Sequence, residues 1–125
     1  MPVQTTNEMY LETILELSEN GPVRSVDIAA KMGVTKPSVN KAMNSLKEHG
    51  YILKERYGAI TLTEQGLAIA TDIASRHTLL RRFLIEVLGC DEKTADNDAC
   101  LMEHVLSAKS VKKWQEYMQK TLGDK

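Results

Sequence analysis

Three side chains with metal-binding or nucleophilic chemistry lie close together in the last third of the chain. Cys100, Glu103 and His104 are spaced i, i+3 and i+4 within the segment ACLMEHV. In a helix this spacing puts the three side chains on one face. Thiolate, carboxylate and imidazole groups bind first-row divalent metals, and a thiol beside an imidazole can form a nucleophile with its base. The residues alone leave open a metal site, a nucleophilic pair and a chance grouping beside a core.

The nucleophile interpretation lacks the other groups that catalysis requires. No separate orienting Asn or Asp, glycine-rich loop or oxyanion-stabilising element accompanies Cys100 and His104, so we expect no enzyme. A metal site needs a further ligand from elsewhere, and His77 is a candidate. It lies on an apolar stripe between Ile73 and Leu80, where an ionisable group needs a partner. A buried, hydrogen-bonded histidine is the alternative interpretation of His77.

Six helices and one hairpin are expected to position these groups. Apolar spacing and capping residues place the helices at about 7–19, 25–32, 36–49, 64–88 and 91–106, and from Ser107 or Ser110 onward. The runs 51–56 and 59–63 flank a turn at Tyr57–Gly58 and predict two short strands. A helix-turn-helix followed by a hairpin is a winged helix. We therefore expect a mainly α chain, with a winged helix-turn-helix and its two-stranded wing over residues 1–63 and three helices over residues 64–125.

The charge distribution favours a nucleic-acid partner. Residues 24–56 carry seven Lys or Arg against three acidic residues, a net charge of +4, whereas the rest of the chain carries −5. The helix after Thr35 is then the recognition helix, and its first turns would enter a major groove. We expect contacts with operator DNA from Arg24, Thr35, Lys36, Pro37, Ser38, Asn40, Lys41, Lys54, Arg56 and Tyr57. A winged helix used for protein contacts is the alternative.

The remaining composition narrows the partners and the compartment. The apolar stripes of the last three helices exceed what one small domain needs, so we expect a homodimer. No run of about 18 apolar residues and no secretory signal pattern occurs, so we expect no membrane partner. Cys90 and Cys100 are the two cysteines, too few for a disulfide framework, which favours a reducing cytoplasm. We also expect no organic substrate.

Several segments, taken together, carry a family resemblance. They are TTNEMYLETI, VTKPSVNKAMNSLKEHGYI, LTEQGLAIA, the Arg76–His77 pair and NDACLMEHVLS, in this order from about Thr5 to Ser107. The set resembles the diphtheria-toxin repressor family, metal-activated transcriptional repressors of iron and manganese uptake. The resemblance implies a winged-helix DNA-binding domain, a helical dimerisation domain and a divalent metal bound between them. For this chain it implies the short form, without the SH3-like third domain.

The resemblance also implies a ligand set. The primary site of the family's iron-type branch matches Met9, Cys100, Glu103 and His104. The manganese-type branch has Asp and Glu at the first two of these positions and adds a Glu that matches Glu12. Because Met and Cys favour softer metals than Mn(II), we expect Fe(II) as the physiological ion, with Mn(II), Co(II), Ni(II) and Zn(II) as alternatives.

A second, ancillary metal site is implied less completely. His77 matches its first ligand. Arg81 stands where the family has a Glu, and a permanent cation cannot bind a metal. Asp96 stands where the family has a His, and its carboxylate can bind a metal, as can that of Glu12. The expected function is therefore a metal-activated repressor of metal uptake. A manganese-responsive regulator, a thiol-redox regulator that uses Cys100 with Cys90, and a regulator with an apolar ligand pocket between helices one, four and five are the alternatives.

Overall fold

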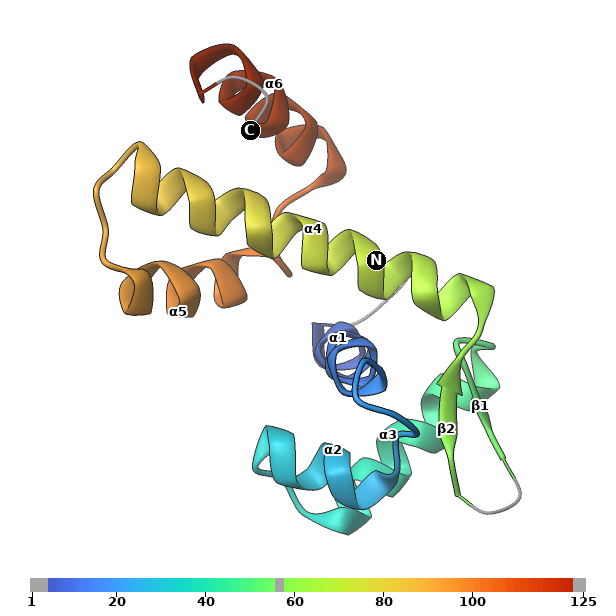
Figure 1. The fold of residues 1–125 in the computed structure, drawn as a ribbon. Helices are drawn as coiled ribbons and strands as arrows, with labels where there is room; N and C mark the ends of the chain where they lie inside the picture. The colour runs from blue at the N-terminus through green and yellow to red at the C-terminus, as the bar shows by residue number, and fades with distance from the viewer. Residues whose placement is uncertain (1–4, 56–57, 123–125) are drawn as a thin grey trace. The chain divides into compact units, whose positions relative to one another are not determined.

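The structure is a computed structural model that describes residues 5–55 and 58–122 (Figure 1). The elements are α1 (Thr5–Ser18), α2 (Ser25–Met32), α3 (Lys36–Glu48), β1 (Ile52–Lys54), β2 (Ile60–Leu62), α4 (Glu64–Glu86), α5 (Glu92–Met102) and α6 (Ala108–Leu122). This order confirms the mainly α winged-helix architecture. The chain forms two compact units, Met1–Asp72 and Ile73–Lys125, which divide within α4. The predicted domain boundary after Thr63 stays a prediction.

The helix-turn-helix of the first unit is fixed by its caps. Gly33 ends α2 in the left-handed conformation, with φ of 68°, and its N–H donates to the Ala29 carbonyl at 2.9 Å. Thr35 begins α3, and its side-chain oxygen accepts the Ser38 N–H at 3.3 Å. The inward stripe of α3 consists of Val39, Met43 and Leu46, all buried. Both helix boundaries agree with the positions that the capping residues predict.

The wing is shorter than its sequence pattern predicted. The strands β1 and β2 pair antiparallel with Ile52 opposite Leu62, and each has three residues. A bridge from Val23 adds a third segment, because the Ile60 N–H donates to the Val23 carbonyl at 2.8 Å. The predicted wing-tip contacts Arg56 and Tyr57 lie outside the described residues.

One aliphatic core unites the elements of the first unit. Its buried members come from α1, the bridge residue before α2, α2, α3, both strands and α4, and they are Tyr10, Leu11, Ile14, Val23, Ile28, Val39, Met43, Leu46, Ile52, Ile60 and Ala70. Burying such side chains contributes about 1.5–3 kcal/mol each, which is enough to hold a small domain together. The buried face of α3 packs on this core, and its opposite face is exposed.

The second unit has a smaller core between α4, α5 and α6. Leu80, Leu84, Ala95 and Ala99 are buried, and partly buried aromatic residues pack against them. Phe83 meets Trp114 edge to face, with ring centroids 5.0 Å apart and an interplanar angle of 82°.

Helix α5 ends earlier than predicted. The apolar spacing predicted a helix to about Leu106, but α5 ends at Met102 and residues 103–106 form a turn. Glu103 keeps helical dihedral angles and its N–H donates to the Ala99 carbonyl at 2.9 Å, so the last helical turn still positions it. His104 lies beyond the helix. The expectation that Cys100, Glu103 and His104 share one helical face therefore holds for the first two by helix geometry, whereas the turn sets the direction of His104.

None of the helices that the structure describes is long and apolar enough to span a membrane.

Candidate functional site

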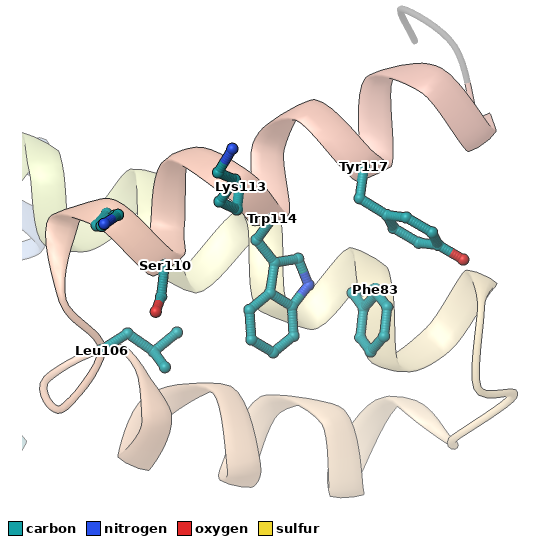
Figure 2. A pocket seen from close by; sticks show the side chains of 7 residues that line it. Phe83, Leu106, Ser110, Lys113, Trp114 and Tyr117 are labelled. Atoms are coloured by element: carbon teal, nitrogen blue, oxygen red, sulfur yellow. The ribbon is translucent and has the colours of Figure 1, made fainter.

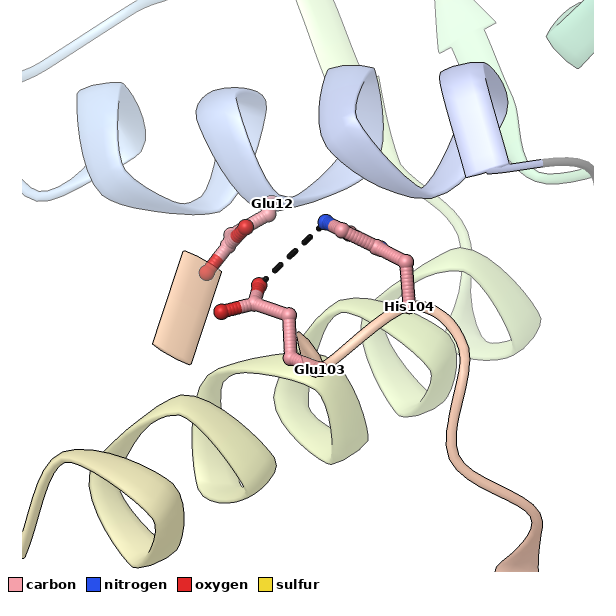
Figure 3. A group of neighbouring side chains, drawn as sticks. All are labelled: Glu12, Glu103 and His104. Carbon is pink, nitrogen blue, oxygen red and sulfur yellow. Dashed lines mark ion pairs between the residues drawn. The ribbon is translucent and has the colours of Figure 1, made fainter. Parts of the chain in front are cut away.

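A carboxylate and an imidazole are buried together in the second unit. Glu103 and His104 have 0% and 3% exposure and are the two buried polar or charged residues in the described part of the chain. Glu103 Oε2 lies 3.4 Å from His104 Nε2 (Figure 3). Burying such groups is costly unless they are hydrogen-bonded, paired or bound to a metal. An oxygen and a nitrogen donor converging in a buried position fit a first-row divalent cation.

His77 contacts the same carboxylate from α4. Its Nδ1 lies 2.8 Å from Glu103 Oε1, and its Nε2 lies 3.6 Å from Asp96 Oδ1. The contact with Glu103 explains how the ionisable side chain of His77 is accommodated on the apolar stripe of α4. In this arrangement His77 orients Glu103, as a histidine beside a metal-binding carboxylate commonly does. Its own role as a ligand stays a prediction.

Asp96 is held by a cation. Arg81 Nε donates to Asp96 Oδ1 at 2.6 Å, and Arg81 Nη2 donates to Glu92 Oε1 at 3.3 Å. The Asp96 side chain is half exposed. A metal at Asp96 would have to compete with a permanently charged guanidinium for the same oxygen. Sequence reasoning recognised that Arg81 cannot bind a metal but missed that it engages the neighbouring candidate ligand.

Cys100 lies on α5, one helical turn before Glu103. Both Cys90 and Cys100 are partly exposed in the described structure. Cys90 follows α4 and packs at the edge of the second unit's core. Cys100 is therefore the cysteine closest in sequence to the buried Glu103–His104 pair, which follows directly after α5.

Two further predicted ligands, Met9 of the primary site and Glu12 of the manganese-type and ancillary sets, belong to α1 of the first unit. Met9 and Glu12 are partly buried and three residues apart, so one face of α1 carries both. The backbone around them is regular, and the Thr13 hydroxyl donates to the Met9 carbonyl at 2.9 Å. Figure 3 draws Glu12 on this helix. This face of α1 offers a thioether and a carboxylate to a metal.

Four of the predicted DNA-binding residues, Arg24, Lys36, Asn40 and Lys54, line a concave surface of the first unit. A cavity of about 340 Å³ is lined by Arg24, Ser25, Val26, Lys36, Asn40, Lys54 and Gly58, from the start of α2, from α3 and from the wing. Three of its residues are cationic, as a phosphate backbone requires. Ser25 and Val26 were not predicted. Their position directly after Arg24, at the first turn of a helix, was the available signal.

The other predicted residues of α3 are all exposed at its start. Lys36, Pro37, Ser38 and Lys41 lie on the surface together with Thr35. The Thr35 hydroxyl donates to the Ser38 hydroxyl at 2.9 Å and accepts the Ser38 N–H. Thr35 therefore has a capping role that is independent of DNA. The lysines remain available to phosphate groups.

A separate apolar cavity lies in the second unit. It has a volume of about 640 Å³ and is lined by Phe83, Leu106, Lys109, Ser110, Lys113, Trp114 and Tyr117 (Figure 2). These residues come from α4, from the turn after α5 and from α6. The small-ligand alternative placed its pocket between helices one, four and five, so this cavity is not the one it required.

Comparison with known proteins gives matches along nearly the whole chain. The family model for the iron dependent repressor N-terminal DNA binding domain matches residues 3–60, and the model for the iron dependent repressor metal binding and dimerisation domain matches residues 63–122. An uncharacterized HTH-type transcriptional regulator of Methanocaldococcus jannaschii is 37% identical over 115 residues, which cover 90% of this chain and 92% of that protein. The HTH-type transcriptional regulator MntR of Lysinibacillus sphaericus is 32% identical over 119 residues, with 95% and 85% covered.

A solved structure of the manganese regulator SloR superposes with a TM-score of 0.80 and 28% sequence identity. The match covers 90% of this chain and 53% of that one, so the chain spans about half the length of the solved regulator. The fold, the two matched domain models and the relatives therefore all indicate the same family of transcriptional regulators.

Proposed function

The chain belongs to the iron-dependent repressor family of metal-dependent transcriptional regulators, and from this premise we propose that it is a metal-activated repressor that binds operator DNA as a homodimer. One observation carries the proposal beyond family membership. The metal binding and dimerisation domain buries a carboxylate against an imidazole at Glu103 and His104. Buried groups of these two types are the donors that a divalent cation requires.

The primary ligands in this proposal are Met9, Cys100, Glu103 and His104. A bound divalent cation would supply positive charge to the buried carboxylate. Thioether and thiolate sulfur favour Fe(II) over Mn(II), so we propose Fe(II) as the physiological ion. A manganese-responsive regulator is the competing proposal, because Glu12 adds an oxygen donor on the same face of α1 as Met9.

A second ion would have to use His77, Glu12 and Asp96. Support for such a site is weaker, because His77 contacts Glu103 and Arg81 engages Asp96. We therefore propose one metal ion per subunit. Anaerobic titration with Fe(II), followed by elemental analysis after gel filtration, measures the stoichiometry. Two ions retained per chain would contradict the proposal.

DNA binding in this proposal uses α3 as the recognition helix. Asn40 would contact base edges in the major groove, and Arg24, Lys36 and Lys54 would contact phosphate groups. Two copies of α3 in a dimer would read half-sites about 34 Å apart. Metal and DNA are linked through one conformation that both favour, so each increases the affinity for the other by the same factor.

The test compares two cysteine variants. Operator sequences are first selected from random duplex DNA by the wild-type protein with Fe(II) under anaerobic conditions. Cys100→Ala is expected to lose at least about tenfold of the Fe(II)-dependent increase in DNA affinity, because it removes a thiolate ligand. Cys90→Ala is the matched control, since it removes the second cysteine of the chain and should behave as the wild type. Equal Fe(II) stimulation of both variants would contradict the assigned ligand set.

A further inference from the structure

The turn that carries the buried donors is held by a residue of α4. Arg76 Nη1 donates to the Leu106 carbonyl at 2.6 Å and to the Glu103 carbonyl at 3.3 Å. The two carbonyl groups bracket residues 103–106, the turn after α5. The next residue of α4, His77, contacts the Glu103 side chain at 2.8 Å. Two consecutive residues therefore hold Glu103, one by its backbone and one by its carboxylate.

Helix α5 has no such support of its own. The last carbonyl groups of a helix lack intrahelical donors and need partners from elsewhere. A basic side chain in the last turn often helps, but α5, all of which the structure describes, has none there. No glycine follows the helix to form a left-handed cap. The guanidinium of Arg76, 27 positions earlier in the sequence, supplies a donor to the carbonyl of the C-cap residue Glu103 and a positive charge at this end of α5.

We propose that Arg76 is the positioning residue for the metal-binding pair Glu103 and His104. Its guanidinium donates to the carbonyl groups of Glu103 and Leu106, and it fixes the turn so that the Glu103 and His104 side chains remain converged in their buried place. This inference rests on the proposed metal-dependent function. It predicts that metal affinity depends on a residue that is not itself a ligand.

The sign of the effect separates this role from simple electrostatics. A guanidinium close to a metal site repels the bound cation, so loss of the charge alone would strengthen metal binding. Loss of positioning would weaken metal binding. Substitutions of groups that orient ligands typically lower metal affinity by about 10- to 100-fold. We therefore expect weaker binding when Arg76 is replaced by an apolar residue.

The experiment titrates the full chain with Co(II) under anaerobic conditions and follows the visible absorption of the bound ion. Arg76→Met is expected to raise the dissociation constant for Co(II) about tenfold or more and to change the ligand-field bands. Arg76→Lys, which keeps a donor and the charge, should recover part of the loss. Arg82→Met is the matched control, because Arg82 lies on the same helix and its Nε pairs with Glu86 Oε2 at 2.8 Å.

The outcomes are distinguishable. If the wild-type protein binds no Co(II), the proposed function fails. If the wild type binds and Arg76→Met binds equally well or more tightly, the positioning role is overturned while the proposed function stands. Amide hydrogen exchange of the metal-free protein gives a second measurement, in which Arg76→Met should accelerate exchange at residues 103–107 and leave α3 unchanged. If Arg76→Met does not fold, Arg76→Lys decides the question: weaker Co(II) binding by a folded variant supports the role, and an unchanged dissociation constant overturns it.

Discussion

Replacing Gly66 by alanine should destabilise the first unit, although the same change stabilises an ordinary helix. Gly66 lies in the first turn of α4, where alanine would be favoured over glycine by about 1 kcal/mol. A Cβ atom built on Gly66, however, falls 1.9 Å from the Tyr51 carbonyl oxygen and 2.9 Å from its carbon. Contacts under 3.0 Å are essentially never seen for real Cβ atoms, so helix and strand must separate by roughly 1 Å.

That separation would disturb three hydrogen bonds at the junction. The Tyr51 carbonyl accepts the Thr63 N–H at 3.0 Å, the Thr63 hydroxyl donates to the Gly50 carbonyl at 2.6 Å, and the Gly66 N–H donates to the Thr63 hydroxyl at 3.1 Å. Each is worth about 1 kcal/mol net. Against the gain in helix propensity, we expect a net loss of about 2 kcal/mol in the free energy of unfolding.

Urea unfolding followed by far-ultraviolet circular dichroism measures this change, with EDTA present and the protein concentration held constant. Ala68→Gly is the matched control, because it makes the reverse exchange at an exposed position of the same helix. It should cost about 1 kcal/mol by propensity alone. Glycine is thus expected to be the more stable residue at position 66 and the less stable one at position 68. A Gly66→Ala protein as stable as the wild type would refute the close approach of α4 to Tyr51.

Three further predictions concern the surface, the core and one helix cap. Lys36→Ala should weaken binding to all DNA sequences alike and lower the number of counterions released on DNA binding by about one. Asn40→Ala should instead cost about 1–3 kcal/mol of binding free energy at one base position. Fluorescence anisotropy titrations at several salt concentrations measure both effects, and a sequence-selective effect of Lys36→Ala would count against its phosphate role. Leu80→Ala should cost about 2–5 kcal/mol in urea unfolding, because Leu80 is fully buried, and a cost under about 1 kcal/mol would contradict its core position. Hydrogen bonds from the Thr94 hydroxyl and N–H hold the pKa of Asp91 below its ordinary value of 3.8. The stability that the Asp91 carboxylate adds is therefore fully present above pH 3.8. It is lost as the pH falls through the lower pKa of Asp91 in the folded protein. Asp91→Asn should therefore be less stable than the wild type at pH 7, and the difference should shrink on acidification below about pH 4; a difference that grows there would contradict the assigned hydrogen bonds.

The sequence predicted the elements wherever a local cap marks their ends. Gly33, Thr35 and Asp91 each act within four residues along the chain, so their effect can be read without tertiary structure. The end of α5 was placed wrongly for the opposite reason. Its apolar spacing continues through Leu106, and no glycine or proline marks the stop. The carbonyl groups of the turn bond instead to Arg76, a tertiary contact that periodicity does not contain.

The same distinction applies to the candidate metal site. Cys100, Glu103 and His104 could be singled out because they are close in sequence and chemically distinctive. That His77 needs a polar partner was also predictable from its apolar surroundings. The identity of that partner, Glu103, and the capture of Asp96 by Arg81 depend on how α5 packs against α4. Those contacts required the fold.

The most direct measurement of metal activation is the affinity of the wild-type chain for its selected operator, determined by fluorescence anisotropy under anaerobic conditions with Fe(II) and with EDTA. We expect Fe(II) to tighten operator binding by at least about tenfold, which corresponds to a coupling free energy of about 1.4 kcal/mol. By the same linkage, operator DNA should tighten Fe(II) binding by the same factor. Equal operator affinity with Fe(II) and with EDTA would contradict metal activation.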